Sequence, residues 1–141
     1  MKPFFALFLI ACARPPVPTP GPDAPRVAIV TTEASIRDAI ATEAPRRGWV
    51  PVPPESSADL VLRLDARAEF YAQVAGRYRW DVTTRVEVRE RANPPYLREI
   101  DTPVFLVYYH EREAAALEAA APALQRKVGA ILEDLRSERR R

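Results

Sequence analysis

Two long runs of alternating apolar and polar residues constrain the fold of this chain more than any other feature. Every second residue is apolar from Leu60 to Phe70 and again from Tyr78 to Val88, with Thr84 as the one polar member. A period of two gives a β-strand one buried and one solvated face. Short connections at residues 72–76 and 93–95 separate these runs from a third predicted strand, residues 97–108. The sequence therefore predicts an antiparallel three-stranded meander.

Shorter elements precede the meander. Residues 26–31 form a continuous apolar run, which is typical of a strand covered on both faces. A helix is predicted after it, with Ser35 three residues before Asp38, close to a capping box. Pro45 and Gly48 end this helix, and residues 49–52 form a short edge strand.

A long helix is predicted over residues 111–137. Its apolar residues recur at spacings of three and four, which gives a narrow apolar stripe. The stripe either packs against the apolar face of the sheet or forms a coiled coil with a partner, and Pro122 is a candidate kink. With the earlier elements, the predicted fold is α+β: two helices on one face of a small, mostly antiparallel sheet. The stripe consists of Ala114, Leu117, Ala121, Leu124, Val128, Ile131 and Leu135.

The N-terminus carries a secretion pattern. Lys2 precedes an apolar stretch, residues 4–11, that is too short to span a bilayer. It ends in Leu9-Ile10-Ala11-Cys12, which resembles the lipobox of bacterial lipoproteins. The resemblance implies that the signal is cut before Cys12, that Cys12 is acylated, and that acyl chains such as palmitate hold the protein at a membrane. By the sorting rule of that lipoprotein family, Ala13 rather than Asp after the cysteine implies the periplasmic face of the outer membrane over the inner membrane.

A proline-rich segment follows the cysteine. Residues 13–25 contain six prolines, which fix φ and remove amide donors. We expect an extended spacer rather than a ligand for aromatic grooves. The predicted organisation is a signal peptide (1–11), a lipidated cysteine with its tether (12–25), one α+β domain (26–137) and a basic tail (138–141). That tail is either a solvated end or a contact with anionic lipid or polymer.

Residues for catalysis are scarce. The chain of 141 residues has one histidine, His110, one cysteine and four glycines. No metal cluster, nucleophile elbow or phosphate loop can be assembled from these, so we expect no enzyme, metal or cofactor. A net charge of +2 gives no support for nucleic-acid binding.

The solvated strand faces are the candidate interaction surface. Their acidic residues stand beside arginines, which predicts cross-strand ion pairs or a charged docking face that includes Arg79 and Arg85. Aromatic residues Trp49, Tyr108 and Tyr109, with Phe105, are candidates for a ligand or partner surface, whereas Trp80 has the phase of the core. The charged set is Asp65, Glu69, Asp81 and Glu87 with Arg63, Arg67, Arg79 and Arg85.

The order of elements resembles a small α/β domain of envelope proteins. The pattern is similar to that of penicillin-binding-protein activator lipoproteins, the curli-secretion lipoprotein and the N-terminal domain of the Tol–Pal periplasmic protein. The matching elements are residues 26–31, the helix that contains Ser35, residues 57–66 and 77–88, and the alanine-rich final helix. Residues 91–97 and 103–110 depart from that pattern. Lipopolysaccharide-assembly lipoproteins are similar in combining a lipobox, two helices and a small sheet. No functional residue can be carried over from these groups. An anchor, a spacer and a small domain without catalytic chemistry favour a non-enzymatic accessory or assembly factor that binds another envelope protein; the alternative is a binding module for lipid, glycan or peptidoglycan fragments.

Overall fold

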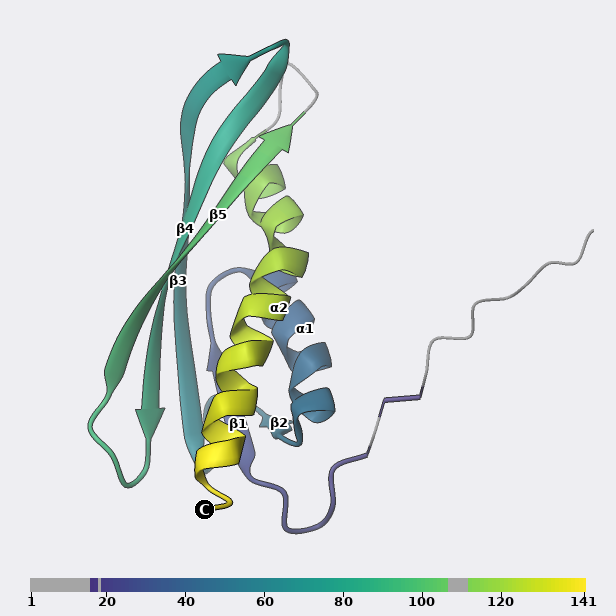
Figure 1. Cartoon of the computed structure of the whole chain (residues 1–141), viewed down its shortest axis with the longest axis vertical. Helices are drawn as coiled ribbons and strands as arrows, with labels where there is room; N and C mark the ends of the chain where they lie inside the picture. Colours follow the sequence, from purple (N-terminus) through teal and green to yellow (C-terminus); the bar gives the residue numbers. More distant parts are fainter. Residues whose placement is uncertain (1–15, 18, 107–111) are drawn as a thin grey trace, which may run out of the picture.

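The computed structural model describes residues 16, 17, 19–106 and 112–141, and places two helices on one face of a five-stranded sheet (Figure 1). The predicted α+β fold is confirmed. The elements are β1 (Arg26–Val30), α1 (Ala34–Glu43), the 3₁₀ turn η1 (Ala44–Arg47), β2 (Val50–Val52), β3 (Leu60–Val74), β4 (Arg77–Glu90), β5 (Tyr96–Leu106) and α2 (Glu113–Glu138).

The strand order is β2-β1-β3-β4-β5. Strands β3, β4 and β5 form the predicted antiparallel meander. β1 runs parallel to both of its neighbours, β2 and β3, because the chain crosses over through α1 before it returns to the sheet. β2 is an edge strand, as predicted, and β5 is the other edge, where Pro103 is tolerated because alternate amides point away from the sheet.

The β3–β4 hairpin is longer than its apolar pattern suggested. Ala75 and Gly76 alone form the turn, with φ angles of 49° and 75°, the left-handed pair of a tight two-residue turn. Residues 72–74, predicted as connection, continue the strand and pair with residues 77–79. A register shift between Phe70 and Ala72 makes Tyr71 an extra residue on β3, and this bulge interrupts the alternation.

The core lies between the sheet and the helices. The buried positions of β3 and β4 face α2, whose buried stripe is wider than a coiled-coil seam. It gains Ala116, Ala120, Gly129 and Leu132, whereas Ala114 is exposed, because α2 packs on α1 as well as on the sheet. The apolar stripe of α2 is therefore buried against α1 and the sheet of the same domain.

The start of α1 differs from the prediction. The helix begins at Ala34, and its N-cap, Glu33, makes no side-chain capping bond. Ser35 lies one residue inside the helix, so the proposed capping box does not form. At the other end the prediction is confirmed: η1 contains Pro45 near its start, and Gly48 ends it with a left-handed φ of 76°.

A buried carboxylate joins the two helices. Glu43 at the end of α1 is only 7% exposed, and its Oε1 accepts a 2.8 Å hydrogen bond from Arg47 Nε. Arg47 also pairs with Glu133 of α2. The hydrogen bond with Glu43 raises the pKa of Arg47. Gly129 of α2 gives the carboxylate its space, because a Cβ there would lie 3.0 Å from Glu43 Cγ.

We predict that Gly129→Ala lowers the free energy of unfolding by about 1–2 kcal/mol, because crowding of Glu43 outweighs the gain of about 1 kcal/mol in helix propensity. Denaturant unfolding measures this change. In a Glu43→Ala background the crowding atoms are gone, and the same substitution should raise stability. A stabilising Gly129→Ala in the parent chain would contradict this account.

Candidate functional site

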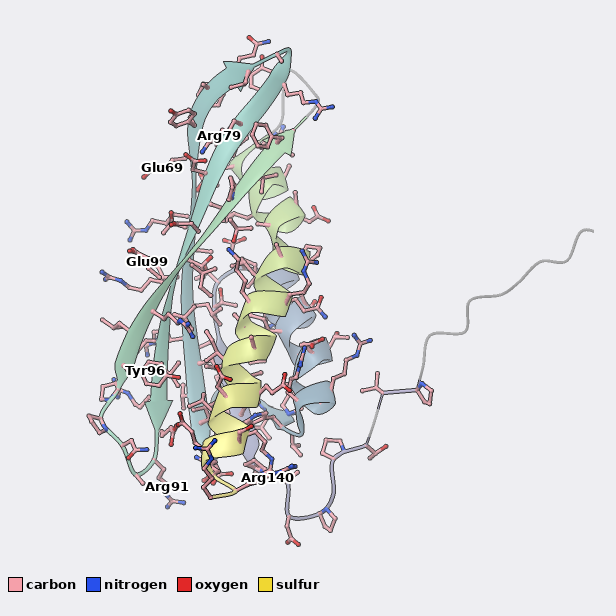
Figure 2. The ribbon with its side chains drawn as sticks, in the orientation of Figure 1. Glu69, Arg79, Arg91, Tyr96, Glu99 and Arg140 are labelled. Carbon is pink, nitrogen blue, oxygen red and sulfur yellow. The ribbon has the colours of Figure 1, made fainter. Side chains whose placement is uncertain are left out.

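None of the described residues covers the sheet face opposite the helices (Figure 1), and we call this face the open face. Figure 2 shows Glu69 and Glu99 on this side of the sheet. The registers place oppositely charged residues side by side across it; Asp65 and Glu99, for example, flank Arg85 on either side. Its residues are Arg63, Asp65, Arg67, Glu69, Arg79, Asp81, Thr83, Arg85, Glu87, Arg89, Leu97, Glu99, Asp101, Pro103 and Phe105.

Ion pairs on the open face run along the strands. Arg67 pairs with Asp65 at 3.3 Å, Arg79 with Asp81 at 2.9 Å and Arg89 with Glu87 at 2.9 Å, each two residues apart. The prediction of ion pairs between neighbouring strands is therefore wrong, because each of these pairs joins two residues of the same strand. Within the described residues, Arg63, Arg85, Glu69 and Glu99 have no oppositely charged atom within 4.0 Å. These charges remain available to a partner.

A shallow depression lies in the middle of this face. It has a volume of about 300 Å³, and its walls are charged or polar. Such a surface can offer hydrogen bonds, but it provides little apolar area to hold a small molecule. The lining residues are Asp65, Arg67, Glu69, Thr83, Arg85 and Glu99.

An aromatic cluster ends the open face near the hairpin turn. The guanidinium carbon of Arg79 lies 4.4 Å from the centre of the Tyr71 ring and 5.8 Å from that of Phe105. Asp81 holds the same arginine through its Nε. Tyr71 is 63% exposed and Phe105 is 50% exposed. We call these three residues, Tyr71, Arg79 and Phe105, the distal cluster; two cation–π contacts fix the arginine between rings that remain open to solvent.

The other side of the same strands also carries aromatics. The Phe70 ring contacts those of Tyr78 and Trp80, with ring centres 5.8 Å apart in each pair. Phe70 is 52% exposed, and Trp80 Nε1 is buried without a partner in the described part of the chain. Trp80 is partly buried and packs against the core, in line with its predicted phase.

The predicted site residues separate in the structure. Arg79 and Arg85 lie on the open face, as expected. Trp49 does not belong to any surface: it is fully buried, its Nε1 donates a 2.9 Å hydrogen bond to the Leu132 carbonyl, and Arg139 lies over its ring. Arg139, assigned to a solvated tail, is thus held by the domain. The predicted roles of Cys12, Tyr108, Tyr109 and His110 fall outside the described residues.

Tyr71 was missed by the sequence analysis. The alternation that assigns faces stops at Phe70, and Tyr71 directly follows another aromatic residue. That pair breaks the period of two, which is the one signal in the sequence for a bulge at this point.

Metal-holding groups and membrane-spanning helices are both absent from the described part of the chain. It contains no group of three histidine, cysteine or carboxylate residues arranged to hold a metal ion. Neither described helix is long and apolar enough to cross a membrane.

Solved structures share this fold. A predicted lipoprotein of Caulobacter crescentus is 15% identical, covers 81% of this chain and 91% of its own, and has a TM-score of 0.56. A minor lipoprotein of Acinetobacter baumannii is 9% identical, with coverage of 80% and 93% and a TM-score of 0.53. A Xanthomonas campestris protein of the DUF330 family is 14% identical, with coverage of 88% and 95% and a TM-score of 0.50.

No family model matches the chain, and no curated protein matches it in sequence. At these low identities the structural neighbours establish a shared fold only. The resemblance to the penicillin-binding-protein activator, curli-secretion and Tol–Pal group stays a prediction.

We predict stability effects of very different size for two aromatic residues. Trp49→Ala should lower the free energy of unfolding by about 3–5 kcal/mol, because it empties a buried site. Tyr71→Ala should change it by less than about 0.5 kcal/mol, because its ring is largely exposed. Denaturant unfolding of both variants checks the assignment; a large loss at Tyr71 would mean that the distal cluster is structural.

Proposed function

We propose that this protein is a lipid-anchored bacterial envelope protein without enzymatic activity, which binds another envelope protein through its open face. Acylated Cys12 is the anchor, and the outer membrane is its location. The lipobox-like residues 9–12 support the anchor. A fold shared with two solved proteins described as lipoproteins is consistent with it.

The observation that carries the docking proposal is the distal cluster. Tyrosine and arginine are enriched among the residues that contribute most to protein–protein binding. Here Arg79 is already held between Tyr71 and Phe105, so less side-chain freedom is lost when a partner covers the cluster. The unpaired charges beside it, Glu69 and Arg85, would form the polar rim of such an interface.

The position of the distal cluster suits a protein held at a membrane. The hairpin turn lies at one end of the domain, and residues 19–25 join β1 at the other end (Figure 1). Figure 2 places Arg79 near the hairpin end and Arg140 at the opposite end. An anchor at Cys12 would therefore hold the domain so that the distal cluster can extend into the periplasm.

The absence of enzymatic activity is part of the proposal. Two carboxylates of the open face, Asp65 and Asp81, are paired with arginines, and the depression beside them is shallow. Acid–base catalysis needs carboxylates that converge on a substrate in a protected site. The geometry of this face is better suited to docking.

The depression favours a second candidate function. A glycan or peptidoglycan fragment could be held there by Arg85, Glu69 and Thr83 through hydrogen bonds. This alternative no longer involves Trp49, which is buried. Arg85→Ala would then abolish binding of purified peptidoglycan fragments, whereas the docking proposal expects no such binding by the parent chain.

The anchor is tested by metabolic labelling. We predict that cells supplied with an alkyne analogue of palmitate label the parent chain, and that Cys12→Ala removes the label because the chain has no other cysteine. Fractionation should then show the variant lost from the outer membrane. A labelled Cys12→Ala chain, or an unlabelled parent chain, would contradict the anchor.

The docking proposal is tested by site-specific crosslinking in cells. A photoreactive residue at position 71 or 105 should capture one envelope protein, and one at Leu97, on the same face and also 63% exposed, should not. The double variant Tyr71→Ala and Phe105→Ala should weaken binding of that protein by about 30-fold or more, since a residue central to an interface contributes at least about 2 kcal/mol. Equal capture from position 97 would argue against the distal cluster.

A further inference from the structure

A cluster of arginines lines a pocket at the end of the domain opposite the distal cluster. The pocket lies between η1 and the last turns of α2 and has a volume of about 370 Å³. Residues from three parts of the chain meet there, including Thr19 and Pro20 of the tether. Figure 2 shows Arg140 at this end of the molecule. The arginines are Arg46, Arg47, Arg136 and Arg140.

Two of these arginines lack an anionic partner. Arg47 is neutralised by Glu43 and Glu133, and Arg46 lies 3.5 Å from Glu43. Arg136 and Arg140 have no carboxylate within 4.0 Å in the described part of the chain, and both line this pocket. Two positive charges in one pocket repel each other, and the negative end of the helix dipole offsets only part of that repulsion.

The Arg136 side chain also has an unsatisfied donor. Its Nε is buried and has no hydrogen-bond partner among the described residues. A buried donor without a partner is unfavourable, and this one belongs to a side chain that lines the pocket. Gly48 forms the adjacent wall, where a Cβ would come within 3.4 Å of this nitrogen.

We infer that this pocket, which we call the arginine pocket, binds the phosphate of an anionic phospholipid headgroup. Guanidinium groups donate paired hydrogen bonds to phosphate oxygens, and Arg136 and Arg140 together would supply the charge of the site. The negative helix terminus is unfavourable for an anion, so recognition depends on the arginines.

The position of the tether favours a lipid headgroup over free phosphate as the ligand of the arginine pocket. Pro20, in the pocket wall, is eight residues from Cys12, a covalent reach of at most about 30 Å. The inference rests on the proposed anchoring at Cys12 in this respect. With Cys12 in the bilayer, the arginine pocket stays within reach of headgroups, and binding becomes an intramolecular event with a high effective concentration.

The test uses the full chain as produced by bacteria, incorporated in nanodiscs of phosphatidylcholine with or without phosphatidylglycerol. Headgroup spin labels report which residues approach the lipid, and the Arg136 Nε resonance reports occupancy of the pocket. We expect phosphatidylglycerol to shift that resonance and to increase broadening at residues 136–140. Excess inorganic phosphate should compete in proportion to its concentration.

Matched variants distinguish binding at the arginine pocket from a general effect of basic charge on the protein surface. Arg136→Gln with Arg140→Gln should lower the ratio of docked to undocked domain about 25-fold, since each arginine near an anionic surface changes binding about fivefold. Arg37→Gln with Arg126→Gln removes the same charge from exposed helix positions and should leave the ratio unchanged. Arg140→Gln alone, at an exposed residue after α2, should give a fivefold effect with unchanged unfolding.

The outcomes distinguish this inference from the anchor. A chain retained by both discs with no effect of phosphatidylglycerol would overturn the pocket and leave the anchor intact. A chain retained only by phosphatidylglycerol discs, with loss in the pocket variant, would support the pocket and contradict the anchor. Equal losses in the pocket and control variants, or a response to inorganic phosphate without a response to phosphatidylglycerol, would overturn the lipid site.

Discussion

The paired alternation of β3 and β4 is the constraint on which the rest of the structure depends. In this register Leu62 lies opposite Val88 and Leu64 lies opposite Val86, so the apolar residues of both strands face the helices. A shift of one residue would bury the charged phase, including Arg63 and Asp65, which no core could accommodate. The same alternation therefore builds the core and the open face. Only at Tyr71 does a bulge break it, and that break brings a second aromatic ring to the face that Arg79 occupies.

The second constraint is the joint between the helices. Glu43 lies buried at the end of α1 because Gly129 leaves room for it and Arg47 neutralises it. Because Arg47 also pairs with Glu133, this joint holds η1 beside α2. Arg46 and Arg136, ninety residues apart in sequence, consequently line the same pocket. The Arg47–Glu133 ion pair thus places η1 beside Arg136, which itself has no carboxylate within 4.0 Å among the described residues.

Local patterns explain why some of this was predictable. The strands followed from alternation and α2 from its apolar spacing, since both periods are properties of neighbouring residues. Trp49 was misassigned because a single aromatic beside Val50 and Pro51 has no period, and its burial depends on Leu132 and Arg139 far along the chain. Ala116 and Leu132 were missed in the stripe because contact with α1 widens it. The residues of the open face could be predicted from the alternation in the sequence. The partners in its ion pairs could not, because they depend on side-chain geometry.

The net charge of the chain gives no indication of how its charged residues are distributed over the structure. The chain has a net charge of only +2, yet acids and bases alternate on the open face, while four arginines gather at the end of the domain opposite the distal cluster. At physiological ionic strength charges interact over roughly 8 Å, so each region acts through its own residues rather than through the net charge. A near-neutral total therefore argues against a long basic groove, but it says little about a pocket of two unpaired arginines. The arginine pocket and the distal cluster lie at opposite ends of the domain, so the membrane contact and the partner contact that we propose could form at the same time.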